Sequence, residues 1–439
     1  MLRSNRFFLP FIGFLLTILI MQTTGWAAED ANWRLEDCIQ QGLNTSPRLR
    51  STSEQLIRAE AGYREDRANR LGTVDITGNY SHNTEVQELS LVIPLPTGVV
   101  ERKMSFGDGN NFDFAATAKL PLYTGGAISN RIRASEADRA ATSYDLAADS
   151  ASFVAEIRRA FFNALGAQQA VKICDLNVFT LTRHHADVAK MVEVGVGTEE
   201  QLTMAEAAVL QAEAAQAAAH SELIASQFAL GNLIGLPGQL IDPTGDLTKS
   251  LFVNDITTSW NDRPEVKSIE LRLKQSLSSA AVAKASFLPN LSAMAAYHYA
   301  KPGVDAISNK WMDYAIVGAN LSWTLWDGKA RQQRLEKSIS QTRTVREKQI
   351  ELRNALQSQF EIVKIRSQYA DHAKTYLAKR AEAVSKRAEM VQTRYKTGSA
   401  TEQEWLDAYD EANAAQLALN NGLVRLRIAE IEYLYTIAK

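Results

Sequence analysis

The sequence predicts a mostly helical membrane protein of the α+β class, built as a tandem duplication and assembled from several chains. Three observations carry this prediction: two very long helices with heptad spacing, two pairs of strands with alternating apolar residues, and the recurrence of both patterns along the chain. Each copy is predicted to contain a helix, two strands, a very long helix and one further helix.

Matched residues recur at nearly constant offsets, which is the signature of an internal repeat. Pro264 lies 217 positions after Pro47, and Gly398 lies 203 positions after Gly195. The offset changes only between the two strand-like stretches, where the first copy carries a longer loop. We therefore predict a first repeat over 28–241, a linker over 242–262 and a second repeat over 263–439.

The first residues, 1–27, have the pattern of a removable export signal. Arg3 and Arg6 precede an apolar run, and Gly25 and Ala27 supply the small residues of a cleavage site. Beyond this segment no apolar stretch of about 18 residues recurs, so no membrane helix is expected. The formal net charge of −2 changes to −4 without the two arginines, a small value that argues against a nucleic-acid partner.

The two long helices are predicted at about 127–194 and 329–397. The first contains no proline, and about 65 residues at 1.5 Å each make a helix of about 100 Å. Apolar residues alternate spacings of four and three from Phe153 to Val192, and again from Leu356 to Tyr395. This period of 3.5 residues predicts coiled-coil packing. The shorter helices are expected end to end alongside the long ones.

Four strands are predicted, at about 73–93, 110–123, 288–300 and 312–326. Apolar and polar residues alternate along them, and aromatic residues such as Trp323 gather at their ends, as in membrane β-strands. Closed barrels begin at about eight strands, and open edges are not tolerated in lipid. Several chains must therefore contribute to one barrel, although this reasoning does not fix their number.

The whole mature chain resembles the TolC family of outer-membrane efflux and secretion channels. The resemblance is carried by the repeat order together with three motifs, namely Leu-Pro-Leu-Tyr-Thr-Gly-Gly at 120–126, Asn-Leu-Ile-Gly-Leu-Pro at 232–237 and Leu-Pro-Asn-Leu at 288–291. It implies a homotrimer whose twelve strands form one barrel in outer-membrane lipid, continued by a helical tunnel in the periplasm. It further implies a passive exit duct for small molecules or proteins, driven by a periplasmic adaptor and an inner-membrane transporter.

The turns between the long and short helices are expected to form the periplasmic tips. Gly195 and Gly398 end the long helices, and Thr198 and Thr401 cap the next ones. The resemblance implies adaptor docking at these four residues, and capping alone is the alternative reading. It also implies that two further residues of the second tip, Glu404 and Asp407, narrow the lumen as stacked acidic rings, since they lie three apart on one helix face.

The chain departs from the family at the gate. Where the best-known members have an Asp and an Arg that hold the gate closed, this sequence has Gln201 and Ala400, while the gate tyrosine is matched by Tyr395. The resemblance therefore implies that this ionic latch is missing.

No enzyme motif, cofactor motif or metal site is predicted. His184 and His185 point about 100° apart on one helix and make a poor metal pair, and His185 is expected as a packed seam residue. Cys38 and Cys174 are expected as structural thiols, with a single bridge left open. Two alternatives to the channel are a periplasmic coiled-coil adaptor and a structural spacer of the envelope.

Overall fold

The computed structural model describes residues 33–437, except 97, 106–108, 252–259 and 306–308. The predicted export signal over 1–27 lies outside the described residues. The first repeat contains α1 (Leu35–Thr45), α2 (Pro47–Ala68), β1 (Thr73–His82), β2 (Glu88–Leu95), β3 (Gly98–Ser105), β4 (Asn110–Tyr123), α3 (Ala127–Glu193) and α4 (Glu199–Leu233). The second contains η1 (Trp260–Asp262), α5 (Pro264–Ala285), β5 (Asn290–Lys301), β6 (Met312–Ser322), α6 (Ala330–Lys396) and α7 (Glu402–Thr436).

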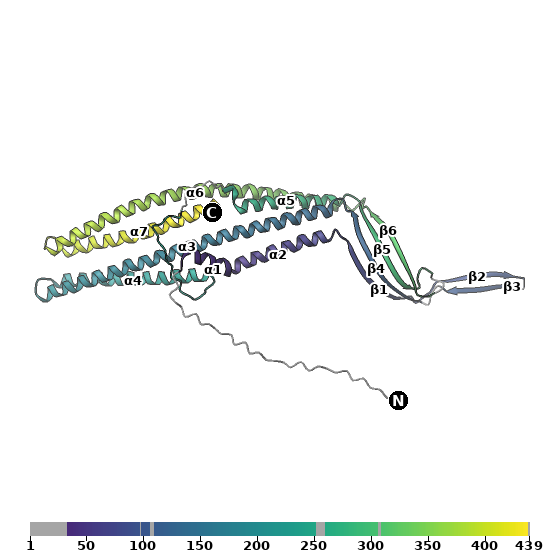
Figure 1. Cartoon of the computed structure of the whole chain (residues 1–439), viewed down its shortest axis with the longest axis horizontal. Coiled ribbons are helices and arrows are strands. Elements are labelled where there is room, and N and C mark those ends of the chain that lie inside the picture. Colours follow the sequence, from purple (N-terminus) through teal and green to yellow (C-terminus); the bar gives the residue numbers. More distant parts are fainter. Residues whose placement is uncertain (1–32, 97, 106–108, 252–259, 306–308, 438–439) are drawn as a thin grey trace, which may run out of the picture.

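The long helices α3 and α6 have 67 residues each and run the length of the helical part. The short helices lie end to end beside them, α2 and α4 along α3, and α5 and α7 along α6, as the sequence predicts (Figure 1). In the half of the layer nearest the tips, contacts order the helices as α4–α3–α7–α6. In the half nearest the sheet, they order them as α2–α3–α5–α6. The protomer is therefore a single curved layer of helices with α6 at one edge throughout.

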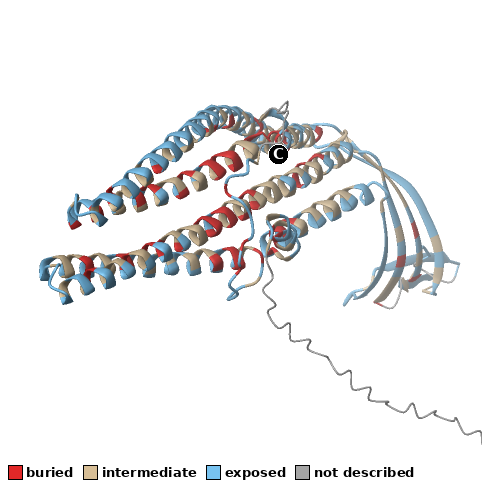
Figure 2. Ribbon diagram, turned by 60° about the vertical axis from the view of Figure 1, so that its left-hand side comes forward, coloured by how far each residue is buried: buried red, intermediate tan, exposed pale blue. Residues whose placement is uncertain are grey.

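The heptad seams are the buried faces of this layer. Side chains from Phe153 to Val188 on α3, and from Leu356 to Val391 on α6, face their partner helices and are buried at heptad spacing. Buried residues recur along the helices, with mostly intermediate residues between them on α3 and mostly exposed residues between them on α6 (Figure 2). None of the described helices carries an apolar stretch that would span a membrane.

The largest apolar cluster lies midway along the layer, where α1 and the ends of α4 and α7 meet α3. Ile157, Phe161 and Leu230 are at its centre and are almost fully buried. Cys38 belongs to this cluster, and burial raises the pKa of its thiol to about 12. Both cysteines are free and buried, which confirms the expectation of structural thiols.

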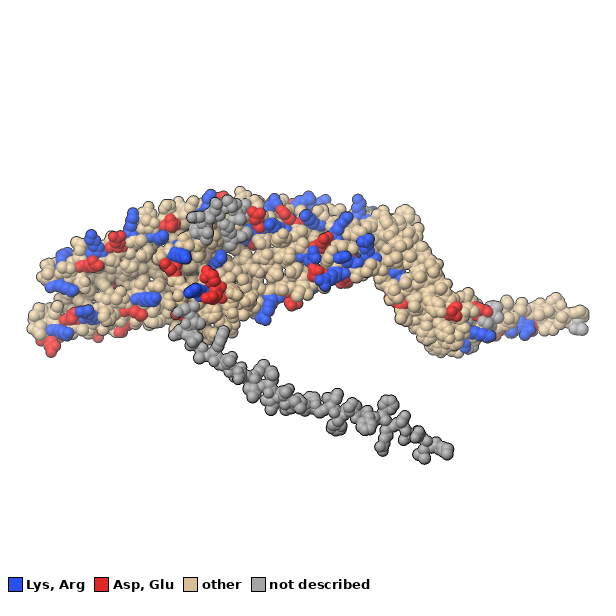
Figure 3. Space-filling model, in the orientation of Figure 1, with Lys and Arg blue, Asp and Glu red and all other residues tan. Residues whose placement is uncertain are grey.

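The sheet joins the two repeats. Its order is β1-β4-β5-β6, all antiparallel, so the central β4–β5 pair is formed between repeats. In the described protomer β1 and β6 are the edges of this sheet. The sheet surface carries few charged side chains, whereas charges are spread along the helices (Figure 3).

The prediction of one strand over 73–93 is wrong in its second half. The pairing of β1 with β4 ends at His82 opposite Asn110, because β4 begins only there. Residues 88–95 pair instead with residues 98–105, in the separate β2–β3 hairpin that extends beyond the sheet (Figure 1).

The last strand is also shorter than the predicted 312–326, because β6 ends at Ser322. Pairing ends there because Ser322 lies opposite Asn290, the first residue of β5. Beyond that point the Arg331 guanidinium donates hydrogen bonds to the carbonyl oxygens of Thr324 and Leu325, at 2.5 and 3.1 Å. Those carbonyls are thus satisfied without a neighbouring strand.

Candidate functional site at the helical tips

The two tips share one backbone geometry. Gly195 and Gly398 have φ of 77° and 75°, the left-handed conformation that an L-residue adopts only with strain. After each glycine the chain closes a hydrogen bond back to the helix, from Val196 N to the Met191 carbonyl at 2.9 Å and from Ser399 N to the Arg394 carbonyl at 2.8 Å. Both long helices therefore end in the same glycine-dependent turn.

The predicted threonine caps are confirmed at both tips. Thr198 accepts a hydrogen bond from the Gln201 backbone N–H at 3.3 Å, while the Gln201 side chain accepts one from Thr198 N at 2.9 Å. Thr401 and Glu404 make the same reciprocal pair, at 3.2 and 3.0 Å. Each box satisfies two backbone donors and holds the first turn of the next helix rigid.

The two predicted lumen acids lie in the first two turns of α7, exposed to solvent in the protomer. Glu404 uses one oxygen for the cap, and Asp407 accepts a hydrogen bond from the Gln403 side chain at 2.6 Å. One turn farther on, burial and then the Asp407 charge raise the pKa of Asp410. The start of α7 thus carries closely spaced carboxylates whose charges repel one another.

Tyr395 does not join these acids. It turns into a buried cluster that links three helices: Tyr395 from α6, His184 from α3, and Glu402, Trp405 and Tyr409 from α7. The His184 imidazole makes an ion pair or hydrogen bond through Nε2 to Glu402 Oε1, and its ring lies on Trp405 with centroids 3.8 Å apart. The ring of Tyr395 meets His184 edge-on at 5.5 Å.

The environment of this cluster is apolar. Trp405 is 3% exposed and packs with Leu181, Val391 and Leu406. Burial, and next the Glu402 carboxylate, raise the pKa of Tyr395 above its usual range, so its hydroxyl stays protonated at physiological pH. A carboxylate in such a place needs a partner, because transferring an unpaired charge from water into an apolar site is costly.

Sequence reasoning missed the roles of Glu402 and His184. Glu402 stands in the first turn of its helix, a position that by itself predicts no buried partner, yet it is 4% exposed. His184 was considered only as a metal ligand, and the described residues contain no group of three metal-ligating side chains. The available signal was the gathering of aromatic residues at one tip only. The positions equivalent to Trp405 and Tyr409 in the first repeat are Leu202 and Glu206.

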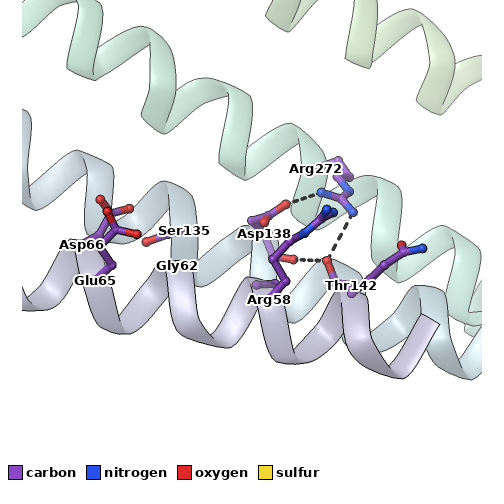
Figure 4. A pocket seen from close by; sticks show the side chains of 10 residues that line it. Arg58, Gly62, Glu65, Asp66, Ser135, Asp138, Thr142 and Arg272 are labelled. Atoms are coloured by element: carbon purple, nitrogen blue, oxygen red, sulfur yellow. Dashed lines mark hydrogen bonds and ion pairs between the residues drawn. The ribbon is translucent and has the colours of Figure 1, made fainter. Parts of the chain in front are cut away.

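A polar pocket of about 320 Å³ lies far from the tips, between α2, α3 and α5 (Figure 4). Arg272 of α5 is its central group and pairs with Asp138 and Asp145 of α3, the second at 2.9 Å. These charge-assisted bonds tie the two repeats together in the half of the layer nearest the sheet. We assign the pocket a structural role.

A family model described as "Outer membrane efflux protein" matches residues 38–236 and 257–436. Among solved structures, CusC superposes with a TM-score of 0.80 at 16% identity, covering 93% of this chain and 92% of that one. The MtrE channel of Neisseria gonorrhoeae gives 0.77 at 18%, covering 92% and 89%. The CmeC channel of Campylobacter jejuni gives 0.76 at 15%, covering 92% and 85%.

No curated protein sequence matches the chain. The family model nevertheless covers most of it, in two segments that coincide with the two repeats. The superpositions cover more than nine tenths of this chain. From this match over both repeats, the chain belongs to the outer membrane efflux protein family.

Proposed function

We propose that the chain is one protomer of a homotrimeric export duct, with a twelve-stranded barrel in the outer membrane and a helical tunnel in the periplasm. The observation that carries the proposal is that the sheet and the helical layer of the protomer both have open edges. Four strands are too few to close a barrel, and open strand edges are not tolerated in lipid. Three copies that pair β6 with the next β1 would supply twelve strands and leave no edge.

The helical layer supports the same assembly, because its two edge helices carry exposed heptad stripes. On α6 the exposed stripe contains Ile362, Tyr369, Tyr376 and Met390, on a different face from the seam that packs on α7. On α4 the stripe contains Leu210 and Ile224 with alanines between them, away from α3. Large side chains on one edge and small ones on the other suit the packing of α6 against α4 of the next copy.

Charge favours the same pairing. Helix α6 carries sixteen Lys and Arg against seven Asp and Glu, whereas α4 carries five Glu and neither Lys nor Arg. Basic side chains line α6 along the upper border of the molecule in Figure 3. Opposite charge at the two edges would steer copies together head to tail.

At the tips we propose three roles for the predicted residues. Gly195, Thr198, Gly398 and Thr401 shape the turns on which a periplasmic adaptor docks, and that adaptor connects the duct to an inner-membrane transporter. Glu404 and Asp407 form two acidic rings that narrow the lumen, and Tyr395 supports them from the buried side. The duct itself is passive and has no enzymatic role, and its substrates are small molecules or secreted proteins.

A photo-crosslinking amino acid at Tyr376 tests the edge pairing whatever the register between the two helices. We expect crosslinked peptides from α4 of a second copy, in a heat-modifiable trimer recovered from the outer membrane. The matched control places the same amino acid at Leu377, which faces α7 within the protomer. Crosslinks from Tyr376 to α7 alone, or recovery only in the soluble periplasm, would overturn the proposal and favour the adaptor alternative.

A further inference from the structure

We propose that His184 and Glu402 form a proton-dependent tie that positions the acidic start of α7 against the first repeat. The inference rests on the proposed channel function and assigns a positioning role to two residues that the sequence alone leaves without one. Protonation of the His184 imidazole strengthens the tie, and deprotonation weakens it. The tip of the second helical hairpin is therefore held more firmly in acid than at neutral or mildly alkaline pH.

The tie joins elements that no backbone connection holds together at this end. His184 lies about two and a half helical turns before the end of α3 at Glu193, and Glu402 is the first residue of α7. Their side chains are 10% and 3% exposed, so water competes little for the bond between them. In the sheet the repeats are joined by the β4–β5 ladder, whereas near the tips only side-chain contacts hold α7 to α3.

Motion of Glu402 is transmitted directly to the acids of the lumen. Glu402 and Glu404 share the first turn of α7, and the reciprocal bonds of Thr401 and Glu404 make that turn rigid. The Glu402 side chain is buried toward α3 while the Glu404 side chain is exposed. A displacement of the inner carboxylate from α3 therefore carries the outer one with it.

The other groups around the pair do not titrate near neutral pH. Tyr395 from α6 and Tyr409 from α7 are the ionisable groups that face it, and burial raises the pKa of both. From α4 the apolar side chains of Met204, Ala208, Val209 and Ala212 pack against the cluster. Both tyrosines therefore keep their protons around neutral pH, which leaves the His184–Glu402 pair as the proposed source of the proton dependence.

The direction of the effect follows from the partners of the imidazole. A carboxylate favours the protonated ring, and so does the Trp405 face stacked on it. The charged pair is bound more strongly than the neutral hydrogen bond that replaces it. The tie is therefore stronger while the imidazole carries its second proton, and it weakens when that proton is lost.

The test is the pH profile of the channel in planar bilayers. For the native trimer we expect the open-to-closed ratio to rise about fivefold between pH 5.5 and 8, a typical size for coupling between two sites. His184→Gln keeps a hydrogen-bonding side chain without a titratable ring, and we expect it to flatten this profile. His185→Gln is the matched control on the next residue of α3, outside the cluster, and should retain the native profile.

A second variant and a second measurement guard against a merely structural effect. Glu402→Gln leaves a hydrogen-bond acceptor but no charge, and we expect it to flatten the profile as His184→Gln does. Hydrogen exchange of the amides at 402–410, corrected for intrinsic rates, should show protection at pH 6 that is lost at pH 8 only where both residues are native. A pH profile unchanged by His184→Gln would overturn the tie, whereas absence of any conductance from the native protein would overturn the channel function instead.

Discussion

The two tips of the molecule have the same backbone and different side chains. In both, a 67-residue helix is followed by a glycine in the left-handed conformation, and a threonine caps the start of a 35-residue helix. In the first tip the residue after the threonine, Glu199, is exposed. In the second tip the matching Glu402 is buried against His184, and the matching position to His184 in the second repeat is Arg387, which pairs with Glu411.

This difference teaches that duplication preserved the turn and allowed one copy to specialise. The turn depends on φ at one glycine and on one hydroxyl, and neither requirement restricts what the next helix carries on its sides. Leu202, Met204 and Glu206 of the first copy are replaced by Trp405, Asp407 and Tyr409 in the second. Variants of matched positions in the two tips therefore separate the shared scaffold from the specialised site.

The largest effect is expected from Trp405→Ala. Removing a buried tryptophan that packs on His184 and Tyr409 leaves a cavity, and such changes cost about 3–5 kcal/mol. The second tip should then open locally, and trypsin should cleave after Arg394 or Lys396 in the assembled trimer. Leu202→Ala in the first tip, where the side chain is only partly buried, should leave cleavage after Lys190 near the native rate. Equal sensitivity of the two tips would contradict the comparison.

A several-fold effect is expected from replacing both Glu404 and Asp407 with alanine. Removal of the proposed acidic rings should raise single-channel conductance and abolish block by divalent cations, because carboxylate oxygens are their preferred ligands. The matched control replaces Gln201 and Met204 of the first tip with alanine, and block should persist there. Unchanged conductance and unchanged block in the Glu404/Asp407 double variant would remove these two acids from the gate.

The smallest effect should be the same in both tips. Gly195→Ala and Gly398→Ala each force an alanine into the left-handed region, at a cost of roughly 1–2 kcal/mol. No atom lies within 4 Å of the position that a Cβ would take at either glycine, so the cost is one of conformation alone. Thermal unfolding followed by circular dichroism should show similar small decreases for the two variants. A much larger decrease for one of them would indicate that the turns are not equivalent.

Much of the fold could be predicted because it follows from local chemistry. The proline-free run, the repeat and the heptad spacing together located α3 and α6, and the glycine and threonine of each tip located the turns. The strand over 73–93 was mispredicted because its alternation continues into residues that pair in another hairpin, and alternation alone does not identify a partner. The end of β6 depends on where its partner β5 begins, because Ser322 lies opposite Asn290.

The candidate site divides in the same way. The caps of Thr198 and Thr401, and the shared face of Glu404 and Asp407, are properties of a single helix and can be read from spacing. The pairing of His184 with Glu402 joins residues 218 positions apart, and no local pattern contains it. Tyr395 was assigned to the gate by resemblance, but its contacts with His184 and the effect of Glu402 on its pKa appear only when α3, α6 and α7 pack together.

By itself the sequence determined the repeat, the two long helices, the amphipathic strands and the turns at the tips, because each depends on residues within a few positions of one another. Only the tertiary structure decided which strand pairs with which, that α4 and α6 form the edges of the helical layer, and that one acid of the second tip is buried. Those outcomes depend on which surfaces are brought together when the layer forms. An unpaired carboxylate is more stable in solvent than in an apolar interior. Glu402 is buried in this structure with His184 beside it as a partner.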